Sequence, residues 1–343
     1  MKKIERFNNS ANYCNTAFDF GFRTDKIPDK PVYSAREDEE VFLTVLPFNA
    51  TSIEEIEQKF DDVDFAMIEE IARSKYLSSL QVYQFVRLRG LHVQRAGSDR
   101  RLKKMMKLRV IREYEIKAPD TLRGLKVYDL DFKGFQIARQ RGVTFNKGNQ
   151  YISARKKQEL ALFDTAEDMK RILVGNMIIL ADLMNGVALD RFGIMETMRL
   201  AQKLPVMDGC ILRTAANIQL DEESILLYEV VRSTPHSMRK LADKVTRYYT
   251  LANHPRYREN NYYGYASVPQ LVICGESYEH CVKIDQYLRS RDLINEKDSL
   301  LYTDDLLYVQ RTLQNLYELD KDGHRTWYRL PARQSVAEME RSA

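Results

Sequence analysis

Residues 64 to about 141 show a succession of hydrophobic patterns that restricts the fold more than any other feature of the chain. Apolar residues first recur at spacings of three and four in three consecutive segments, as on one face of an amphipathic helix. Two short extended runs follow, separated by a turn-rich stretch, and a further helical segment closes the region. We expect helices over residues 64–72, 79–90, 98–109 and 132–140, strands over residues 110–116 and 125–130, and helix N-caps at Asp64, at Ser78 or Ser79, and at Ser98.

This order of elements is typical of a winged-helix domain, in which one helix enters the major groove of duplex DNA and the strand hairpin forms the wing. We therefore expect a winged-helix DNA-binding domain over residues 61–142. The charge distribution agrees with this expectation. From Arg73 to Lys117 the chain carries 13 Lys or Arg and 3 Asp or Glu residues, whereas the remaining 298 residues carry 40 basic and 46 acidic residues. One cationic segment on a slightly anionic chain is typical of a polyanion-binding element.

The third expected helix separates apolar from cationic residues around its axis. At 100° per residue, Leu102, Met105 and Met106 share one face, and most of the basic residues lie on the opposite face. A merely solvated face normally carries both signs, but Asp99 is the one acidic residue of this helix, so we favour DNA binding. The candidate contacts are Arg95, Ser98, Arg100, Arg101, Lys103, Lys104 and Lys107 around the helix, and Lys117, Arg123 and Lys126 on the hairpin.

The remaining sequence indicates a second domain with flanking segments. Residues 1–60 have the composition of an N-terminal arm, with a strand pattern at residues 40–46, and residues 143–157 resemble a linker. Strands and helices alternate over residues 158–330, which predicts an α/β domain, and residues 331–343 form a polar tail. The expected elements are strands over 187–195, 210–215, 225–231, 270–274 and 299–302, and helices over 165–184, 235–251, 278–290 and 304–319.

From the composition we expect a cytoplasmic protein without a membrane partner. Apolar residues make up 44% of the chain, yet no run of about 18 apolar residues exists. The N-terminus carries lysines without the apolar stretch of a secretory signal. The four cysteines form no Cys-x-x-Cys pair, so we expect reduced thiols and no structural metal.

Several short motifs are shared with one protein family. In the first domain they are Ser79-Leu-Gln-Val-Tyr-Gln-Phe, Arg101-Leu-Lys-Lys-Met, Val110-Ile-Arg-Glu-Tyr and Val127-Tyr-Asp-Leu-Asp-Phe-Lys-Gly. In the second they are Pro205-Val-Met-Asp-Gly, Leu227-Tyr-Glu-Val-Val-Arg-Ser-Thr and Lys240-Leu-Ala-Asp-Lys-Val-Thr-Arg-Tyr-Tyr. Over about residues 60–310 the chain resembles the replication-relaxation (MobC-like) family of plasmids and integrative elements of Gram-positive bacteria. The resemblance implies a restriction-endonuclease-like second domain and a role in plasmid mobilisation or replication.

The endonuclease-like domain raises the question of catalysis. A metal-dependent nuclease needs carboxylates that meet at Mg²⁺ and a cation beside the phosphate. Asp208 and Glu229 would hold the metal and Lys244 would supply the cation. However, the active endonuclease pattern has a lysine two positions after the second acidic residue, where this chain has Val231. We therefore favour the structural alternative, in which Glu229 and Lys244 form an interior ion pair.

These observations favour a DNA-binding accessory protein of a mobile element, acting on double-stranded DNA beside a relaxase or a replication initiator. We expect a homodimer, because duplex readers commonly match the two-fold symmetry of their sites. Two alternatives stay open at this point. One is a Mg²⁺-dependent nickase that uses the second domain, and the other is a winged-helix transcriptional regulator.

Overall fold

The chain divides into two compact units of mixed helix and sheet. The N-terminal unit is Ala35–Asn176, and the C-terminal unit combines Met177–Ala343 with Met1–Ser34. The computed structural model describes residues 31–47, 49–143, 145, 164–187, 189, 191–195, 197–199, 211–221, 224–253, 268–295, 300–310, 315–328 and 330.

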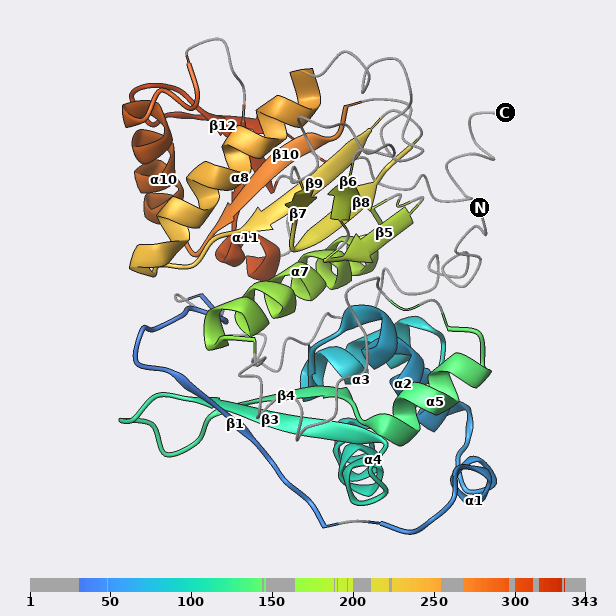
Figure 1. The fold of residues 1–343 in the computed structure, drawn as a ribbon. Helices are drawn as coiled ribbons and strands as arrows, with labels where there is room; N and C mark the ends of the chain where they lie inside the picture. Colours follow the sequence, from blue (N-terminus) through green and yellow to red (C-terminus); the bar gives the residue numbers. More distant parts are fainter. Residues whose placement is uncertain are drawn as a thin grey trace, which may run out of the picture. The chain divides into compact units, whose positions relative to one another are not determined.

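The N-terminal unit packs helices against a four-stranded antiparallel sheet with the strand order β1-β3-β4-β2 (Figure 1). The first half of α7 (Ala166–Met184) also belongs to this unit. The succession of helices and strands expected between residues 64 and 140 is confirmed, with the short strand β2 added. The other elements are β1 (Glu40–Leu43), α1 (Ile53–Glu57), α2 (Asp62–Ser74), β2 (Leu77–Ser78), α3 (Ser79–Leu88), α4 (Arg95–Lys107), β3 (Ile111–Lys117), β4 (Leu125–Leu130) and α5 (Phe132–Gln140).

This unit extends beyond the predicted limits of 61 and 142 at both ends. Strand β1 pairs along the outer edge of β3, so residues 40–43 belong to the sheet and not to a separate arm. At the other end, the Gln81 side chain donates to the Leu173 carbonyl at 2.7 Å, and the Asn176 side chain donates to the Tyr76 carbonyl at 3.0 Å. Hydrogen bonds between distant segments therefore set the limits of the unit, and local composition could not reveal them.

Side chains at the helix starts explain where two of these helices begin. Asp61 caps α2 in a reciprocal capping box with Asp64, so the helix starts before the predicted cap at Asp64. Ser78 caps α3 in the same way with Gln81, which selects Ser78 over Ser79. The predicted cap of α4 at Ser98 is wrong. The helix already starts at Arg95, because the Ser98 amide donates to the Gln94 carbonyl at 2.9 Å within the first turn.

The C-terminal unit is built on a seven-stranded mixed sheet with the order β13-β12-β11-β10-β9-β8-β5. Strands β9, β10 and β11 run parallel, and the other pairings are antiparallel. Two more strands, β6 (Thr197–Arg199) and β7 (Ile211–Arg213), pair with each other. The elements are β5 (Arg191–Ile194), β8 (Ala216–Gln219), β9 (Ile225–Val230), α8 (Pro235–Asn253), β10 (Gln270–Gly275), α10 (Tyr278–Ser290), β11 (Leu301–Asp304), α11 (Asp305–Gln310), β12 (Leu316–Leu319) and β13 (Arg325–Tyr328).

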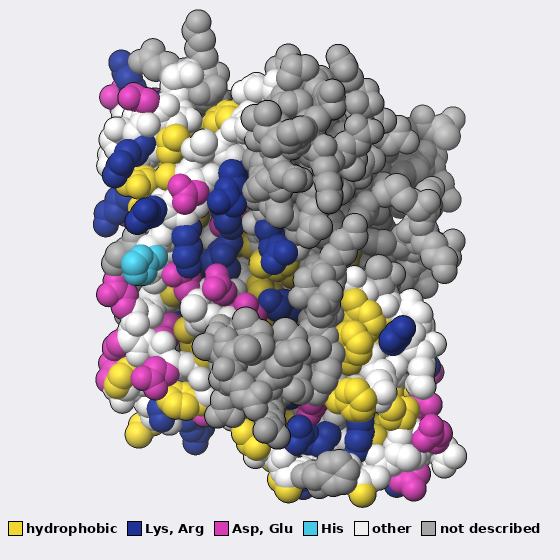
Figure 2. Space-filling model, in the orientation of Figure 1, with side chains coloured by type: hydrophobic (Ala, Val, Ile, Leu, Met, Phe, Trp, Pro, Cys, Tyr) yellow, Lys and Arg dark blue, Asp and Glu magenta, His cyan; other side chains and the backbone are white. Residues whose placement is uncertain are grey.

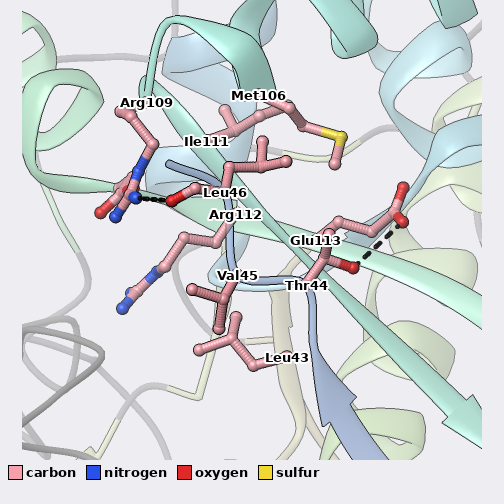
Figure 3. Close-up of a pocket in the computed structure, with 10 residues that line it drawn as sticks. Leu43, Thr44, Val45, Leu46, Met106, Arg109, Ile111, Arg112 and Glu113 are labelled. Atoms are coloured by element: carbon pink, nitrogen blue, oxygen red, sulfur yellow. Dashed lines mark hydrogen bonds and ion pairs between the residues drawn. The ribbon is translucent and has the colours of Figure 1, made fainter. Parts of the chain in front are cut away.

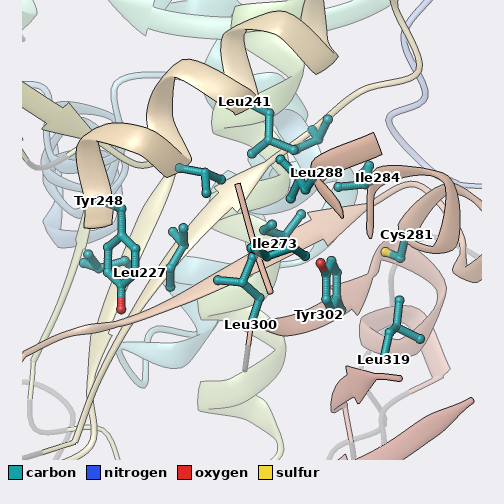
Figure 4. Close-up of a cluster of buried hydrophobic side chains, with 14 of the residues drawn as sticks. Leu227, Leu241, Tyr248, Ile273, Cys281, Ile284, Leu288, Leu300, Tyr302 and Leu319 are labelled. Carbon is teal, nitrogen blue, oxygen red and sulfur yellow. The ribbon is translucent and has the colours of Figure 1, made fainter. Parts of the chain in front are cut away.

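The main core of this unit lies between the sheet and the helices α8 and α10 (Figure 4). Leu227 and Ile273 on the central strands face Leu241 of α8 and Ile284 of α10, and all four side chains are at most 2% exposed. Burying such aliphatic side chains stabilises the fold by about 1.5–3 kcal/mol each relative to full exposure. This shared core holds α8 against β9, which determines the surroundings of Glu229 and Lys244.

Most elements predicted for this unit are confirmed, and one is wrong. Strand β10 and helix α10 lie where the sequence predicts them, and α8 continues two residues beyond its predicted end. The predicted helix over residues 304–319 is wrong, because α11 ends at Gln310 and residues 316–319 form β12 between β11 and β13. Tyr317, completely buried on β12, pairs with Tyr302 and Trp327 on the neighbouring strands. The predicted linker and tail lie largely outside the described residues.

No helix in the described ranges is both long and apolar enough to cross a membrane.

Candidate nucleic-acid interface

Helix α4 presents a cationic face to solvent and an apolar face to the core. Leu102 and Met105 are at most 1% exposed, and they hold the helix against the rest of the N-terminal unit. Figure 2 shows a group of Lys and Arg side chains at its lower end, over α4. The solvent-exposed residues of the helix include Arg100, Lys103, Lys104 and Lys107. The division between apolar and basic faces predicted from the helical wheel is therefore confirmed.

Two of these lysines have exposed side chains without internal partners among the described residues. In the part of the chain that the structure describes, the ammonium groups of Lys103 and Lys107 form no hydrogen bond or ion pair. Among the described residues, the Arg100 guanidinium donates only from Nε, to the Ala96 carbonyl at 3.3 Å. These three cations are thus accessible to phosphate oxygens without the loss of an internal ion pair.

Arg101 points toward the start of α2 and forms ion pairs there. Its guanidinium lies 2.7 Å from an Asp61 oxygen and 2.8 Å from an Asp64 oxygen. The Asp64 side chain is 1% exposed, so Arg101 neutralises a buried carboxylate. Lys104 partly shares this role, since its ammonium donates to the Lys59 carbonyl at 3.1 Å and to Asp64 at 3.4 Å. These ion pairs attach α4 to α2 through Arg101, and its predicted contact with DNA stays a prediction.

Two further predicted contacts around α4 are less accessible than the sequence predicts. Ser98 is 1% exposed, so it cannot hold a phosphate as predicted, because its hydroxyl faces the interior. Arg95 donates to the Ser79 hydroxyl at 3.1 Å, lies 3.7 Å from Asp99, and stacks over the Tyr83 ring. Its side chain is still 40% exposed, so one edge of Arg95 faces solvent.

The β3–β4 hairpin carries the second group of predicted contacts. Lys126 forms an ion pair with Glu113 on the neighbouring strand at 2.9 Å, which reduces its availability to a ligand. Arg123 is exposed and, among the described residues, its side chain has no hydrogen bond or ion pair. Lys117 ends β3 and is half-buried. Of the three hairpin cations, Arg123 is therefore the most accessible.

A small hollow, open to solvent, lies between the segment after β1 and the end of α4 (Figure 3). Leu43, Val45, Met106 and Ile111 supply apolar walls. Arg109 closes one side, where its guanidinium donates to Asp131 at 2.6 Å and to the Leu46 carbonyl at 2.7 Å. Because these polar groups bond within the protein, the hollow offers a ligand little more than apolar contact.

The C-terminal unit brings together two of the three predicted nuclease residues. The Lys244 ammonium on α8 lies 2.7 Å from both carboxylate oxygens of Glu229 on β9, and the Glu229 side chain is 5% exposed. This is the interior ion pair expected under the structural alternative. Asp208 lies outside the described residues. A Mg²⁺ ion at Glu229 would have to share the carboxylate oxygens with the Lys244 ammonium, because these oxygens are the metal's ligands.

One other group of possible metal ligands occurs within the described ranges, on the exposed turn between β12 and β13. It consists of Asp320, Asp322 and His324. Asp320 accepts hydrogen bonds from the backbone amides of Asp322 and His324 at 2.9 and 2.8 Å, which is how a carboxylate stabilises a turn. These contacts explain the cluster without an ion.

No protein-family model matches the chain, and no curated protein or solved structure matches it either. Function is therefore inferred from the geometry of α4 and the β3–β4 hairpin, together with the motifs of the sequence.

Proposed function

We propose that the chain binds double-stranded DNA through the N-terminal unit, with α4 in the major groove. The observation that carries this proposal is the exposed cationic face of α4, where Arg100, Lys103 and Lys107 have charges accessible from solvent. The major groove is wide enough to admit one α-helix, and Lys or Arg side chains bind phosphates and guanine edges there. A helix face that is merely solvated normally carries charges of both signs. Three like charges on one face are therefore better explained by binding to a polyanion.

The order of the surrounding elements supports a winged-helix assignment for this unit. Helix α2, the short strand β2, and helices α3 and α4 are followed directly by the antiparallel hairpin β3–β4. In this arrangement the hairpin is the wing, and it carries Arg123 near its tip. A helix in the major groove and a hairpin beside it would contact the duplex at two places.

For the biological role we propose an accessory DNA-binding protein in the mobilisation or replication of a plasmid or integrative element. The sequence motifs shared with the replication-relaxation family support this role, and a relaxase or a replication initiator is the corresponding partner. The mixed sheet around β9 and β10, with Glu229 on β9, supports a restriction-endonuclease-like C-terminal unit. We further propose a homodimer on DNA, which light scattering of the complex would distinguish from a single bound copy.

A Mg²⁺-dependent nuclease is less well supported by the contacts of the C-terminal unit. Lys244 engages both oxygens of Glu229, and Val231 stands where the active pattern has a lysine. Such a pair attaches α8 to β9 without any need for a metal. The C-terminal unit then serves as a scaffold or as a contact for a partner.

A salt titration of the full-length chain on a fluorescein-labelled 30-base-pair duplex tests the proposal. Each phosphate contact contributes about 0.9 to the slope of log affinity against log salt concentration. The Lys103→Ala, Lys107→Ala double variant should therefore lower the slope by about two. The matched control is the Lys283→Ala, Lys321→Ala double variant, which removes the same charge from exposed positions of the C-terminal unit.

The control should keep the wild-type slope. The proposal is overturned if the wild-type chain fails to bind the duplex at any salt concentration. Equal losses of slope in both double variants would also refute it, because the binding would then depend on net charge and not on α4.

A further inference from the structure

The turn between β3 and β4 exposes an apolar side chain almost completely. Leu122 is 96% exposed, more than Val45 at 79% or Phe132 at 50% among the exposed large hydrophobic residues of the described ranges. A single exposed leucine needs no explanation by itself. This leucine, however, lies at the tip of the hairpin proposed as the wing, and the exposed Arg123 follows it directly.

The backbone around Leu122 is held in place on both sides. Thr121 closes a turn, because its amide and its hydroxyl both bond to the Ala118 carbonyl, at 3.1 and 2.8 Å. On the other side, the Gly124 amide donates to the Glu115 carboxylate at 2.8 Å. A Cβ atom at position 124 would lie 2.5 Å from the Glu115 side chain, so this close approach requires glycine.

A third contact reaches the tip from a distant segment. The Arg36 guanidinium lies 2.9 Å from both carboxylate oxygens of Asp120. Arg36 precedes β1 in the chain, so the segment that extends the sheet also restrains the hairpin turn. Leu122 and Arg123 are therefore presented by a pre-organised backbone, which lowers the entropy lost when they contact a ligand.

We propose that Leu122 and Arg123 enter the minor groove of the duplex that α4 binds, and that Leu122 packs against the groove floor. This inference rests on the proposed DNA-binding function. Proteins that use the minor groove commonly insert apolar side chains there and place arginine in the strongly negative narrow groove of A·T-rich DNA. The guanine N2 amino group projects into the same groove and would meet Leu122 with an unpaired donor. The wing therefore selects duplexes that lack this amino group.

The test uses the full-length chain and two 30-base-pair duplexes of one G·C-rich sequence, the second with inosine in place of every guanine. Inosine keeps the O6 and N7 acceptors of the major groove and lacks the N2 amino group, so the major-groove edges that α4 meets are unchanged. The wild-type chain should bind the inosine duplex at least about fivefold more tightly, the low end of what one base-pair change costs in a recognised site.

Substitutions at the tip distinguish the contact of Leu122 with the minor groove from a general dependence of binding on DNA flexibility. Leu122→Ser and Leu122→Gln should bring the affinity ratio close to one, and Leu122→Ile should keep it, because only the first two remove the apolar contact. Arg123→Ala should weaken binding to both duplexes and lower the salt slope by about one. The four substitutions replace two exposed residues, Leu122 and Arg123, so unchanged thermal unfolding is expected.

Two results would overturn the inference. One is equal affinity of the wild-type chain for the two duplexes, and the other is an unchanged ratio in both Leu122→Ser and Leu122→Gln. If the Lys103→Ala, Lys107→Ala variant still loses salt slope in those cases, the DNA-binding proposal stands and only the minor-groove contact fails. If the wild-type chain binds neither duplex, the DNA-binding proposal itself fails.

Discussion

Arg101 and Lys103 lie two positions apart on α4, yet the structure predicts opposite consequences when each is replaced by methionine. The Arg101 guanidinium bonds to Asp61 and Asp64, whereas the Lys103 ammonium faces solvent. Both substitutions remove one positive charge and keep an apolar stem. We expect Arg101→Met to lower stability and Lys103→Met to lower affinity for DNA.

The size of the stability loss follows from the burial of the two carboxylates. The Asp61 side chain is 56% exposed, so its ion pair contributes less than about 1 kcal/mol. Asp64 is 1% exposed and would lose its shortest ionic contact, at 2.8 Å, while keeping Lys104 at 3.4 Å. The loss of one of two partners by a buried charge lowers the free energy of unfolding by about 2 kcal/mol. For a unit of this size the loss corresponds to a fall of about 4–8 °C in Tm.

Urea unfolding followed by two signals assigns the loss to the correct unit. Far-ultraviolet circular dichroism reports both units, and fluorescence of the single tryptophan, Trp327, reports the C-terminal unit. Arg101→Met should lower the urea midpoint seen by circular dichroism and leave the midpoint seen by Trp327 fluorescence unchanged. Its slope of log affinity for DNA against log salt concentration should stay within about half a unit of wild type. Lys103→Met should change stability by less than about 0.5 kcal/mol and lower the slope by about one. If Arg101→Met kept full stability and lost a unit of slope, the internal role of Arg101 would be refuted.

Two further predictions concern the C-terminal unit. Burial lowers the pKa of His280 to about 4, below its usual 6.5, so the folded state binds this proton less readily and loses stability as pH falls from 6.5 toward 4. Between pH 7 and pH 5 the wild type should lose about 2 kcal/mol more than His280→Asn, whose amide oxygen can still accept the Glu276 N–H. Urea midpoints measured by Trp327 fluorescence check this difference, and equal changes in both chains would contradict it. The second prediction concerns DNA cleavage. Supercoiled plasmid incubated with the protein and Mg²⁺ or Mn²⁺ should be shifted on a gel but remain uncut, because Lys244 engages the Glu229 carboxylate. Nicking that both Asp208→Ala and Glu229→Ala abolish would establish a nuclease.

The helices of the N-terminal unit were largely predictable because each repeats its apolar residues with the period of a helix. Leu102 and Met105 are buried as the helical wheel of α4 predicts, and the capping box of Ser78 and Gln81 follows a sequence signature. The exposed tip at Leu122 was not singled out from the sequence, although a turn-rich stretch between two strands was the available signal. Its significance depends on restraints from Glu115 and Arg36, which local patterns do not show.

The sequence by itself determined the local periodicities, the cationic segment and the order of elements from α2 to α5, because these depend on residues close together in the chain. Only the tertiary structure decided which cations remain accessible. Asp61 and Asp64 stand 40 and 37 residues before Arg101, and the packing of the helices brings them within 3 Å of it. The same holds for residues 316–319, where pairing with β11 and β13 outweighs a helical pattern, since strand pairing depends on partners that the local sequence does not contain.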